Sequence, residues 1–445
     1  MNPTDGIRKD TGGNVMKQWR KIAALLLLAV CVVNTVGCSA EKTVTDGRRR
    51  ETALRAEDME LTAGAASLPD AEMLPMDENA ANAYNDFAYR IFRECCKADT
   101  AGSLMVSPFS LYMALGMLTN GAKGQTKDEL EKALGMDIET LNRYCAGWTE
   151  QLTNDRFAEF HSANSFWIDE RYKDAVREEF LAACNSYYKA SVFRSKLTDS
   201  VPAINRWVKD KTDGMIPELL QFLPPETATV LINAIVFDAE WSDEFEKTDT
   251  RDGIFTKEDG TTETRSMMHG TADDIYYENE LCTGFLKSYM GGRFAYVALL
   301  PKEGVSLETL NASVNTQSMK DIMTHSRCGD VYITVPVYSE DYSVSLVDAL
   351  KAMGVEEAFN SYTADFMGMM KENPVYVSEI LQKTRIEVNE SGTKAAAATA
   401  VVMYDCCMAV RDEKPVYYVN LDRPFMYMIM DTETNTPIFI GNIRG

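Results

Sequence analysis

The residues with the widest chemical range in this chain are its ten cysteines and three histidines. No two cysteines form a Cys-x-x-Cys pair and the histidines lie far apart, so their spacing predicts no metal-binding framework. The sequence also lacks the Gly-x-Ser-x-Gly, His-Glu-x-x-His, P-loop and Gly-x-Gly-x-x-Gly motifs. These observations predict no cofactor and disfavour an enzyme. We interpret His161, His269 and His325 as structural or surface residues.

Two cysteines, Cys406 and Cys407, are adjacent and follow a segment of unusual composition. The alternating run at 386–390 is typical of a strand, and it leads through Gly392 into four alanines at 395–398. Alanine is the best helix former, so a short helix is one interpretation, yet two β-branched valines end the run at 401–402. Side chains this small fit both an exposed loop and a strand inserted between two others. The segment therefore predicts a conformational switch that hinges at Gly392.

The helices and strands that hold this segment in place are predicted from the sequence patterns after residue 79. Apolar residues at helical spacing predict helices over 82–96, from Ser107 and Pro108 onward, and over 203–211. β-Branched and aromatic runs predict strands at 165–168, 229–237, 294–300, 331–337, 375–377 and 425–430. Because helices and strands interleave irregularly and no long polar gap divides them, we predict one α+β domain over 77–445.

Charge and composition limit the classes of function. The chain has 45 Lys and Arg against 67 Asp and Glu, a net charge of −22, which disfavours nucleic acid as a partner because the field repels phosphate. An apolar fraction of 45% is too high for a disordered chain, and 445 residues supply a large core. We interpret the cysteines in the middle of the chain as isolated buried thiols.

The N-terminal residues are typical of an export signal. A basic stretch ends at Lys21 and precedes an apolar run at 22–33 that is too short to span a bilayer. Small residues before Cys38 resemble a bacterial lipoprotein cleavage site. We therefore predict that 1–37 is a signal peptide, that Cys38 carries a lipid anchoring the protein to a membrane, and that the protein is exported to the cell envelope or beyond. A plain secretory signal and an uncleaved anchor are the alternatives.

Cleavage before Cys38 would leave 40 Lys and Arg against 65 Asp and Glu, a net charge of −25. Met16, just before the basic stretch, is an alternative start. Residues 38–76 are rich in Ala, Thr and charged residues without periodic apolar spacing, so we predict a flexible tether. The three arginines at 48–50 are interpreted as a solvated linker run, with a proteolytic site as the alternative.

Several blocks of the sequence resemble the serpin family, in family order. Glu390-x-Gly392-Thr393 followed by four alanines resembles the inhibitory hinge that begins a serpin reactive-centre loop, and 419–426 resembles the signature after that loop. Further matching blocks begin at Val106, Asn164, Ile204, Leu231 and Phe439. The resemblance covers about residues 78–445. It implies a serpin fold with three β-sheets, eight or nine helices and an exposed reactive-centre loop.

The resemblance also implies a function. Serpins are suicide inhibitors of serine proteases: the protease cleaves the loop, forms an acyl-enzyme and is trapped when the loop inserts into the central sheet. It implies a monomer whose partner is a target protease in a covalent complex, with papain-like cysteine proteases as alternative targets. The residues carried over to the hinge are Glu390, Gly392, Thr393, Ala395, Ala396, Ala397 and Ala398.

Five residues carry over to the sites that control opening of the sheet. Ser107, Ser110 and Asn233 fall in the family's shutter, where polar side chains govern sheet opening, and Trp241 falls in the breach, where the loop first enters. Gln382 replaces the histidine usual in the shutter. Because an amide both donates and accepts hydrogen bonds, we expect the gate to persist.

The position of the scissile bond follows from counting. Seventeen residues from Glu390 place P1 at Cys406 and P1′ at Cys407, and a shorter hinge gives Asp405. The loop is several residues longer than in typical inhibitory serpins, which leaves Arg411 as a further alternative. Cys406 suits a small or apolar S1 pocket, as in elastase-like proteases.

Other functions stay open at the level of sequence. Oxidation of Cys406 or Cys407 could gate the loop, although two tolerated small residues are the simpler interpretation. A non-inhibitory serpin that acts as a binding protein is the alternative function. An enzyme on a lipid tether is the third hypothesis, and no catalytic constellation supports it.

Overall fold

The computed structural model describes residues 55–68, 73–273, 275–372, 375–393 and 414–445. Within these residues the chain forms three β-sheets and nine α-helices, which confirms the predicted α+β class and number of sheets. Residues 53–445 form one compact unit by their contacts. None of the helices described is both long and apolar enough to cross a membrane.

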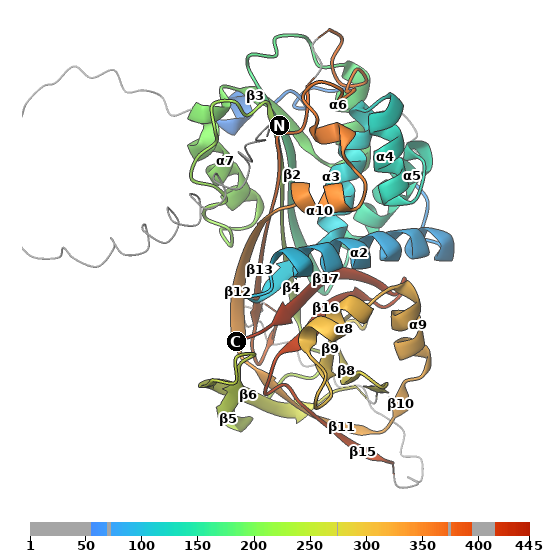
Figure 1. The fold of residues 1–445 in the computed structure, drawn as a ribbon, viewed down its shortest axis with the longest axis vertical. Helices are drawn as coiled ribbons and strands as arrows, with labels where there is room; N and C mark the ends of the chain where they lie inside the picture. The colour runs from blue at the N-terminus through green and yellow to red at the C-terminus, as the bar shows by residue number, and fades with distance from the viewer. Residues whose placement is uncertain (1–54, 69–72, 274, 373–374, 394–413) are drawn as a thin grey trace, which may run out of the picture. The chain divides into compact units, whose positions relative to one another are not determined.

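The three sheets, which we call A, B and C, are drawn in Figure 1. Sheet A has the order β12 (Tyr338–Ser345), β13 (Glu379–Val388), β14 (Gly392–Thr393), β4 (Thr229–Glu240), β2 (Ala158–Asp169) and β3 (Ser191–Ser195). Sheet B has the order β1 (Leu104–Val106), β17 (Thr436–Ile443), β16 (Phe425–Asp431), β9 (Phe294–Pro301), β8 (Cys282–Ser288), β7 (Ile275–Glu278) and β10 (Arg327–Cys328). Sheet C has the order β15 (Val416–Asn420), β11 (Asp330–Pro336), β6 (Thr262–Thr271) and β5 (Thr250–Thr256).

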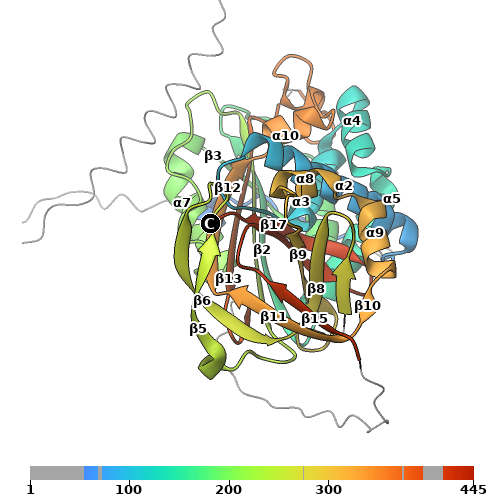
Figure 2. The same cartoon turned by 60° about the horizontal axis from the view of Figure 1, so that its bottom comes forward.

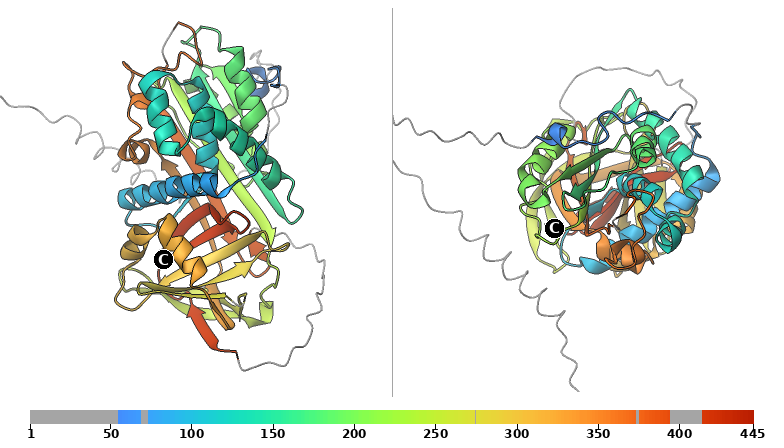
Figure 3. Two further views of the ribbon diagram at one scale, coloured as in Figure 1. Left: turned by 90° about the vertical axis from the view of Figure 1, so that its right-hand side faces the viewer. Right: turned by 90° about the horizontal axis from the view of Figure 1, so that it is seen from above.

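Helices cover both faces of sheet A, as Figures 1 and 3 show. The α-helices are α2 (Glu78–Ala98), α3 (Pro108–Gly121), α4 (Gly124–Leu134), α5 (Ile138–Thr153), α6 (Glu178–Tyr188), α7 (Leu197–Lys211), α8 (Leu307–Ser313), α9 (Thr316–Thr324) and α10 (Val347–Ala352). Side chains alternate along β4: Val230 and Ile232 pack in one apolar cluster with α7, whereas Leu231 and Ile235 pack in the main core with α3. Strand β4, inside sheet A, is thus buried on both faces.

The helix predicted from Ser107 and Pro108 lies beneath the centre of sheet A. Ser107 is the N-cap residue of α3, and its side chain accepts a hydrogen bond from the N–H of Ser110. Nearly every residue of α3 is buried, because sheets A and B and neighbouring helices surround it. The other predicted helices are confirmed within α2 and α7, and the strands predicted at 165–168, 229–237, 294–300 and 425–430 lie within β2, β4, β9 and β16. The strand predicted at 331–337 is confirmed over 331–336, because β11 ends at Pro336.

The strand predicted at 375–377 is wrong. Val375 and Val377 are buried as the apolar pattern indicates, but this segment belongs to no sheet. The N–H of Val377 donates to the carbonyl of Ala358, and the carbonyl of Tyr376 accepts from the hydroxyl of Thr229. These bonds run to a carbonyl of the short 3-10 helix at Glu357–Phe359 and to a threonine side chain, so they do not form the ladder of a strand.

The flexible tether predicted at 38–76 is wrong for residues 55–68. The N–H of Leu61 donates to the carbonyl of Val192, and the N–H of Arg194 donates to the carbonyl of Met59, so this segment lies along β3 at the edge of sheet A. Ala56 is buried in the cluster beneath α7. The folded unit therefore begins before residue 77, because a few small or apolar residues suffice to pair with an open sheet edge.

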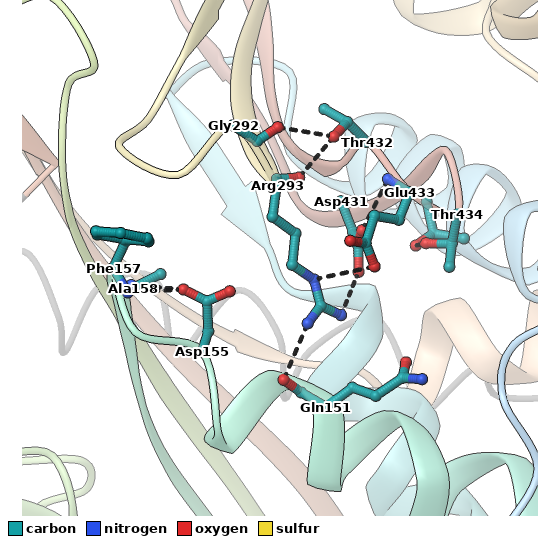
Figure 4. Close-up of polar contacts among 11 residues, drawn as sticks. Gln151, Asp155, Phe157, Ala158, Gly292, Arg293, Asp431, Thr432, Glu433 and Thr434 are labelled. Atoms are coloured by element: carbon teal, nitrogen blue, oxygen red, sulfur yellow. Dashed lines mark hydrogen bonds and ion pairs between the residues drawn. The ribbon is translucent and has the colours of Figure 1, made fainter. Parts of the chain in front are cut away.

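A buried ion pair ties sheet B to the end of α5, as Figure 4 shows. The guanidinium of Arg293 donates to the carboxylate of Asp431 at 3.0 Å and to the carbonyl of Gln151 at 2.9 Å. Asp431 is fully buried, and the hydroxyl of Thr432 closes the cluster by donating to the carbonyl of Gly292. The cluster lies at the turn between β8 and β9, which includes Tyr289.

Candidate reactive-loop hinge and the seam of sheet A

Strands β13 and β4 are paired along one part of their length and separated along another. Their parallel pairing runs from Glu379 opposite Val230 to Thr384 opposite Ile235. Beyond it, β14 lies between them and pairs antiparallel with both: Thr393 is opposite Val388 on one side and opposite Ala239 on the other. We call the directly paired part the seam. The chain that enters the reactive loop has thus already opened sheet A at one end.

The turn at 389–391, which we call the hinge turn, is held by all three of its carbonyls. The backbone N–H of Trp241 donates to the carbonyl of Ser391 at 2.9 Å, and its indole N–H donates to that of Asn389 at 3.0 Å. The N–H of Phe245 donates to the carbonyl of Glu390 at 3.0 Å. Inside the turn, the side-chain oxygen of Asn389 accepts from the N–H of Ser391 at 2.9 Å, which is an Asx turn.

Residue 392 must be a glycine because its backbone lies too close to β4 to leave room for a side chain. A Cβ placed on this residue would lie 2.2 Å from the carbonyl oxygen of Ala239, which no side chain tolerates. The next residue, Thr393, is 1% exposed, and its hydroxyl lies 2.5 Å from the hydroxyl of Tyr289. Gly392 and Thr393 are therefore fitted to an interior strand position.

An aromatic cluster forms the floor beneath the hinge turn. The rings of Trp241 and Tyr289 stack with centroids 4.5 Å apart, and burial raises the pKa of Tyr289 well above its ordinary value, so its hydroxyl keeps a proton. The ammonium of Lys287, only 3% exposed, lies 4.7 Å from the ring centroid of Phe245 and donates to the carbonyl of Thr271. Burial lowers the pKa of Lys287.

The shutter residues meet behind the seam in one hydrogen-bond network. The amide nitrogen of Gln382 donates to the side-chain oxygen of Asn233 at 2.5 Å and to the carbonyl of Ser107 at 2.9 Å, while its oxygen accepts from the N–H of Ser107 at 2.9 Å. Asn233 in turn donates to Ser110 and to Asn164. The amide at 382 thus uses both its donor and its acceptor, as the sequence led us to expect.

Gln382 and Asn233 also face each other across the seam, because they are Cα partners in the pairing of β13 with β4. Both side chains are 2% exposed or less. Separating the two strands must therefore break a buried hydrogen bond as well as the main-chain ladder.

Sequence reasoning missed four contributors to this region. Asn164 lies in a block that matches the family but was given no role, and Asn389 follows the strand pattern as an ordinary turn residue. Tyr289 and Phe245 come from distant segments. Only a three-dimensional fold places them under the hinge, and no local pattern signals their role.

Several predicted site residues lie outside the described residues. They are Cys38, Ala395, Ala396, Ala397, Ala398, Asp405, Cys406, Cys407 and Arg411. Nothing in the structure tests the positions assigned to them.

The described thiols and imidazoles form no reactive cluster. Burial raises the pKa of Cys95 to about 12 and that of Cys282 to about 11, so both stay protonated thiols at neutral pH. Cys328 is exposed, which corrects the interpretation of the central cysteines as uniformly buried. His161 is near Glu159, His269 bonds Thr334 and His325 bonds a carbonyl of α9. Over the described part of the chain, no three His, Cys, Asp or Glu residues are placed to hold a metal ion.

In this fold the short strand β14 already lies between β13 and β4 of sheet A. A family model, Serpin (serine protease inhibitor), matches residues 82–444. An uncharacterised serpin-like protein of Thermococcus kodakarensis is 31% identical over 373 residues, which cover 82% of this chain and 85% of that protein. Leukocyte elastase inhibitor of Homo sapiens is 29% identical over 392 residues, covering 83% and 100%.

Solved structures agree. The thermophilic serpin tengpin in its native state has a TM-score of 0.76 at 33% identity, over 86% of this chain and 99% of that one. The chain therefore belongs to the serpin family, as the sequence blocks predicted. The name of the matching family model describes the family as serine protease inhibitors.

Proposed function

We propose that this protein is an irreversible suicide inhibitor of serine proteases. A target serine attacks the carbonyl carbon of Cys406, an ester forms, and the amine of Cys407 leaves with the C-terminal part of the chain. The loop upstream of the cut then inserts between β13 and β4 and carries the bound protease with it. The observation that supports this proposal best is the hinge: Gly392 and Thr393 already occupy the first two positions of the inserted strand.

The energetics favour insertion once the loop is cut. A dozen inserted residues add main-chain hydrogen bonds worth roughly 0.5–1.5 kcal/mol each, about 10 kcal/mol in total. Insertion removes the parallel pairs of the seam but replaces each strand edge with an antiparallel partner. Alternation with period two gives Ala395, Ala397, Thr399 and Val401 the same orientation as Thr393, and all are small. The uncleaved form is then kinetically trapped.

The direct test is to incubate the full-length chain with leukocyte elastase, trypsin and papain. The expected result is an SDS-stable complex with an elastase-like enzyme, together with a C-terminal peptide whose mass begins at Cys407. Cleavage of the chain without any SDS-stable complex would show a substrate or a non-inhibitory serpin instead.

The P1 assignment has its own test. We expect Cys406→Arg to redirect inhibition from elastase-like enzymes to trypsin, because trypsin accepts a cationic P1 side chain. Arg411→Ala serves as the matched control and should leave the protease preference unchanged. If Arg411→Ala abolishes trypsin inhibition while Cys406→Arg changes nothing, the scissile bond lies at Arg411.

We also propose that the protein is exported and anchored in a cell envelope through Cys38, as a monomer. The basic and apolar pattern before Cys38 supports this proposal. Cys38→Ser should move the protein from the membrane fraction to the soluble one, whereas Cys328→Ser should not. Retention of the Cys38→Ser variant in membranes would contradict lipid anchoring.

A further inference from the structure

The outer face of sheet C carries an unpartnered aromatic pair beside the attachment point of the reactive loop. Tyr332 of β11 and Tyr418 of β15 are opposite each other in the parallel pairing, and their rings stack with centroids 5.5 Å apart. Tyr332 is 45% exposed and Tyr418 is 69% exposed, with Val416 next to them at 49%. Exposed aromatic pairs of this kind are typical of contact surfaces.

The pair forms one end of a groove of about 680 Å³ that runs across the sheet. Its middle is a row of ordered polar side chains: the hydroxyl of Thr334 bonds the oxygen of Asn420 at 2.8 Å and the Nδ1 of His269 at 3.2 Å. Its far end is lined by Asp249, Arg251 and Asp252. Figure 2 brings this side of sheet C toward the reader.

We propose that this groove docks the body of the target protease, and so contributes to the choice of protease independently of the residue at P1. This proposal rests on the proposed function, because it assumes that a target protease binds and cleaves the reactive loop. The groove fits a protease surface that lies beside the active-site cleft and carries apolar and cationic side chains. The tyrosine faces suit both kinds of side chain. Three aspartates against one arginine in the lining of the groove, together with the net charge of −22, favour a basic one.

The short stretch of chain between the proposed scissile bond and sheet C supports a bound protease as the partner of this groove. Eight residues lie between Cys407 and Val416, where β15 begins, so the two are at most about 32 Å apart along an extended chain. A protease of about 230 residues has a radius of gyration of about 17 Å and is therefore about 45 Å across. An enzyme that holds Cys406 and Cys407 must stand close to sheet C, and the exposed side chains of β15 lie nearest to the loop in sequence.

The test compares Tyr332→Ala/Tyr418→Ala with the wild type and with Tyr362→Ala, in the full-length chain. Tyr362 is 95% exposed and lies outside sheet C, so it is a matched control for the loss of a surface tyrosine. With leukocyte elastase we expect the double variant to show a second-order rate constant of inhibition at least about tenfold lower, with an unchanged stoichiometry and Tm. The control should match the wild type.

A second arm uses elastase whose catalytic serine is replaced by alanine, so that docking is measured without acylation. Weaker binding of the double variant than of the wild type supports the docking groove. Equal affinities, or no binding by either protein, overturn it. Docking by the wild type without any SDS-stable complex with active elastase overturns the trapping function alone. A wild-type dimer that the double variant loses assigns the groove to a second copy of the chain and also overturns the proposal.

Discussion

Strands β13 and β4 are separated by a third strand at one end of their boundary and paired directly with each other at the other end. At the hinge end, β14 separates them and the turn at 389–391 is fixed by three carbonyl bonds. At the seam, the strands pair directly and the amide of Gln382 bonds that of Asn233 across them. Under the proposed mechanism, the hinge end favours insertion and the seam opposes it, so the balance between the two ends would determine when the sheet opens.

The largest effect is expected from a charge at the hinge. Thr393→Arg places an unpaired cation at a site that is 1% exposed, at a cost of several kcal/mol. Since 1.4 kcal/mol corresponds to a tenfold change in rate, insertion should slow by more than about tenfold, and the acyl-enzyme should hydrolyse first. Titration of protease activity should show conversion from inhibitor to substrate. Thr393→Ser is the control; full inhibition by the arginine variant would remove the hinge from the account.

A substitution that weakens the seam should promote loop insertion, whereas the charge at the hinge should slow it. Gln382→Leu leaves the N–H of Ser107 and the oxygen of Asn233 without their bonds to residue 382, at roughly 1–3 kcal/mol for each unsatisfied group. We expect the loop to insert without cleavage, seen as inhibitory activity that decays during incubation. Gln382→His, which keeps a donor and an acceptor, should decay more slowly. Equal half-lives for all three proteins would show that this network does not hold the seam.

A smaller but local effect is expected at Gly392. Gly392→Ala should push the hinge out of sheet A, because its Cβ would collide with the carbonyl of Ala239. Hydrogen exchange of β14 should rise, while the seam keeps its protection. Gly64→Ala is the control, since nothing lies within 4 Å of a Cβ there. Unchanged exchange in β14 would mean that the strand position of Gly392 is not required.

The smallest effect is expected at the hydroxyl pair. Tyr289→Phe removes the bond to Thr393 and keeps the ring stacked on Trp241, so stability should fall by about 1 kcal/mol. Thermal unfolding measures this change, and Tyr362→Phe is the control. A loss as large as that of Thr393→Arg would indicate that the aromatic floor, and not the strand position, controls the hinge.

Sequence predicted the parts of this region that follow from local pattern. The small side chains after Gly392 indicated a segment that fits an interior strand. The alternation at 386–390 indicated a strand, but β13 begins at Glu379 and ends at Val388, and 389–391 form a turn. The sequence could not show that Thr393 is already buried, because that depends on Tyr289 and on the position of β4. The buried run at 375–377 was mistaken for a strand, since burial alone does not specify pairing, and the attachment of 55–68 to β3 left no periodic pattern.

The central claim is that cutting the loop allows it to insert between β13 and β4. The most direct measurement is the Tm of the full-length chain before and after limited proteolysis within the loop. Insertion worth about 10 kcal/mol should raise the Tm of the cleaved protein by at least about 10 °C. An equal or lower Tm after cleavage, with the C-terminal peptide still bound, would contradict the account.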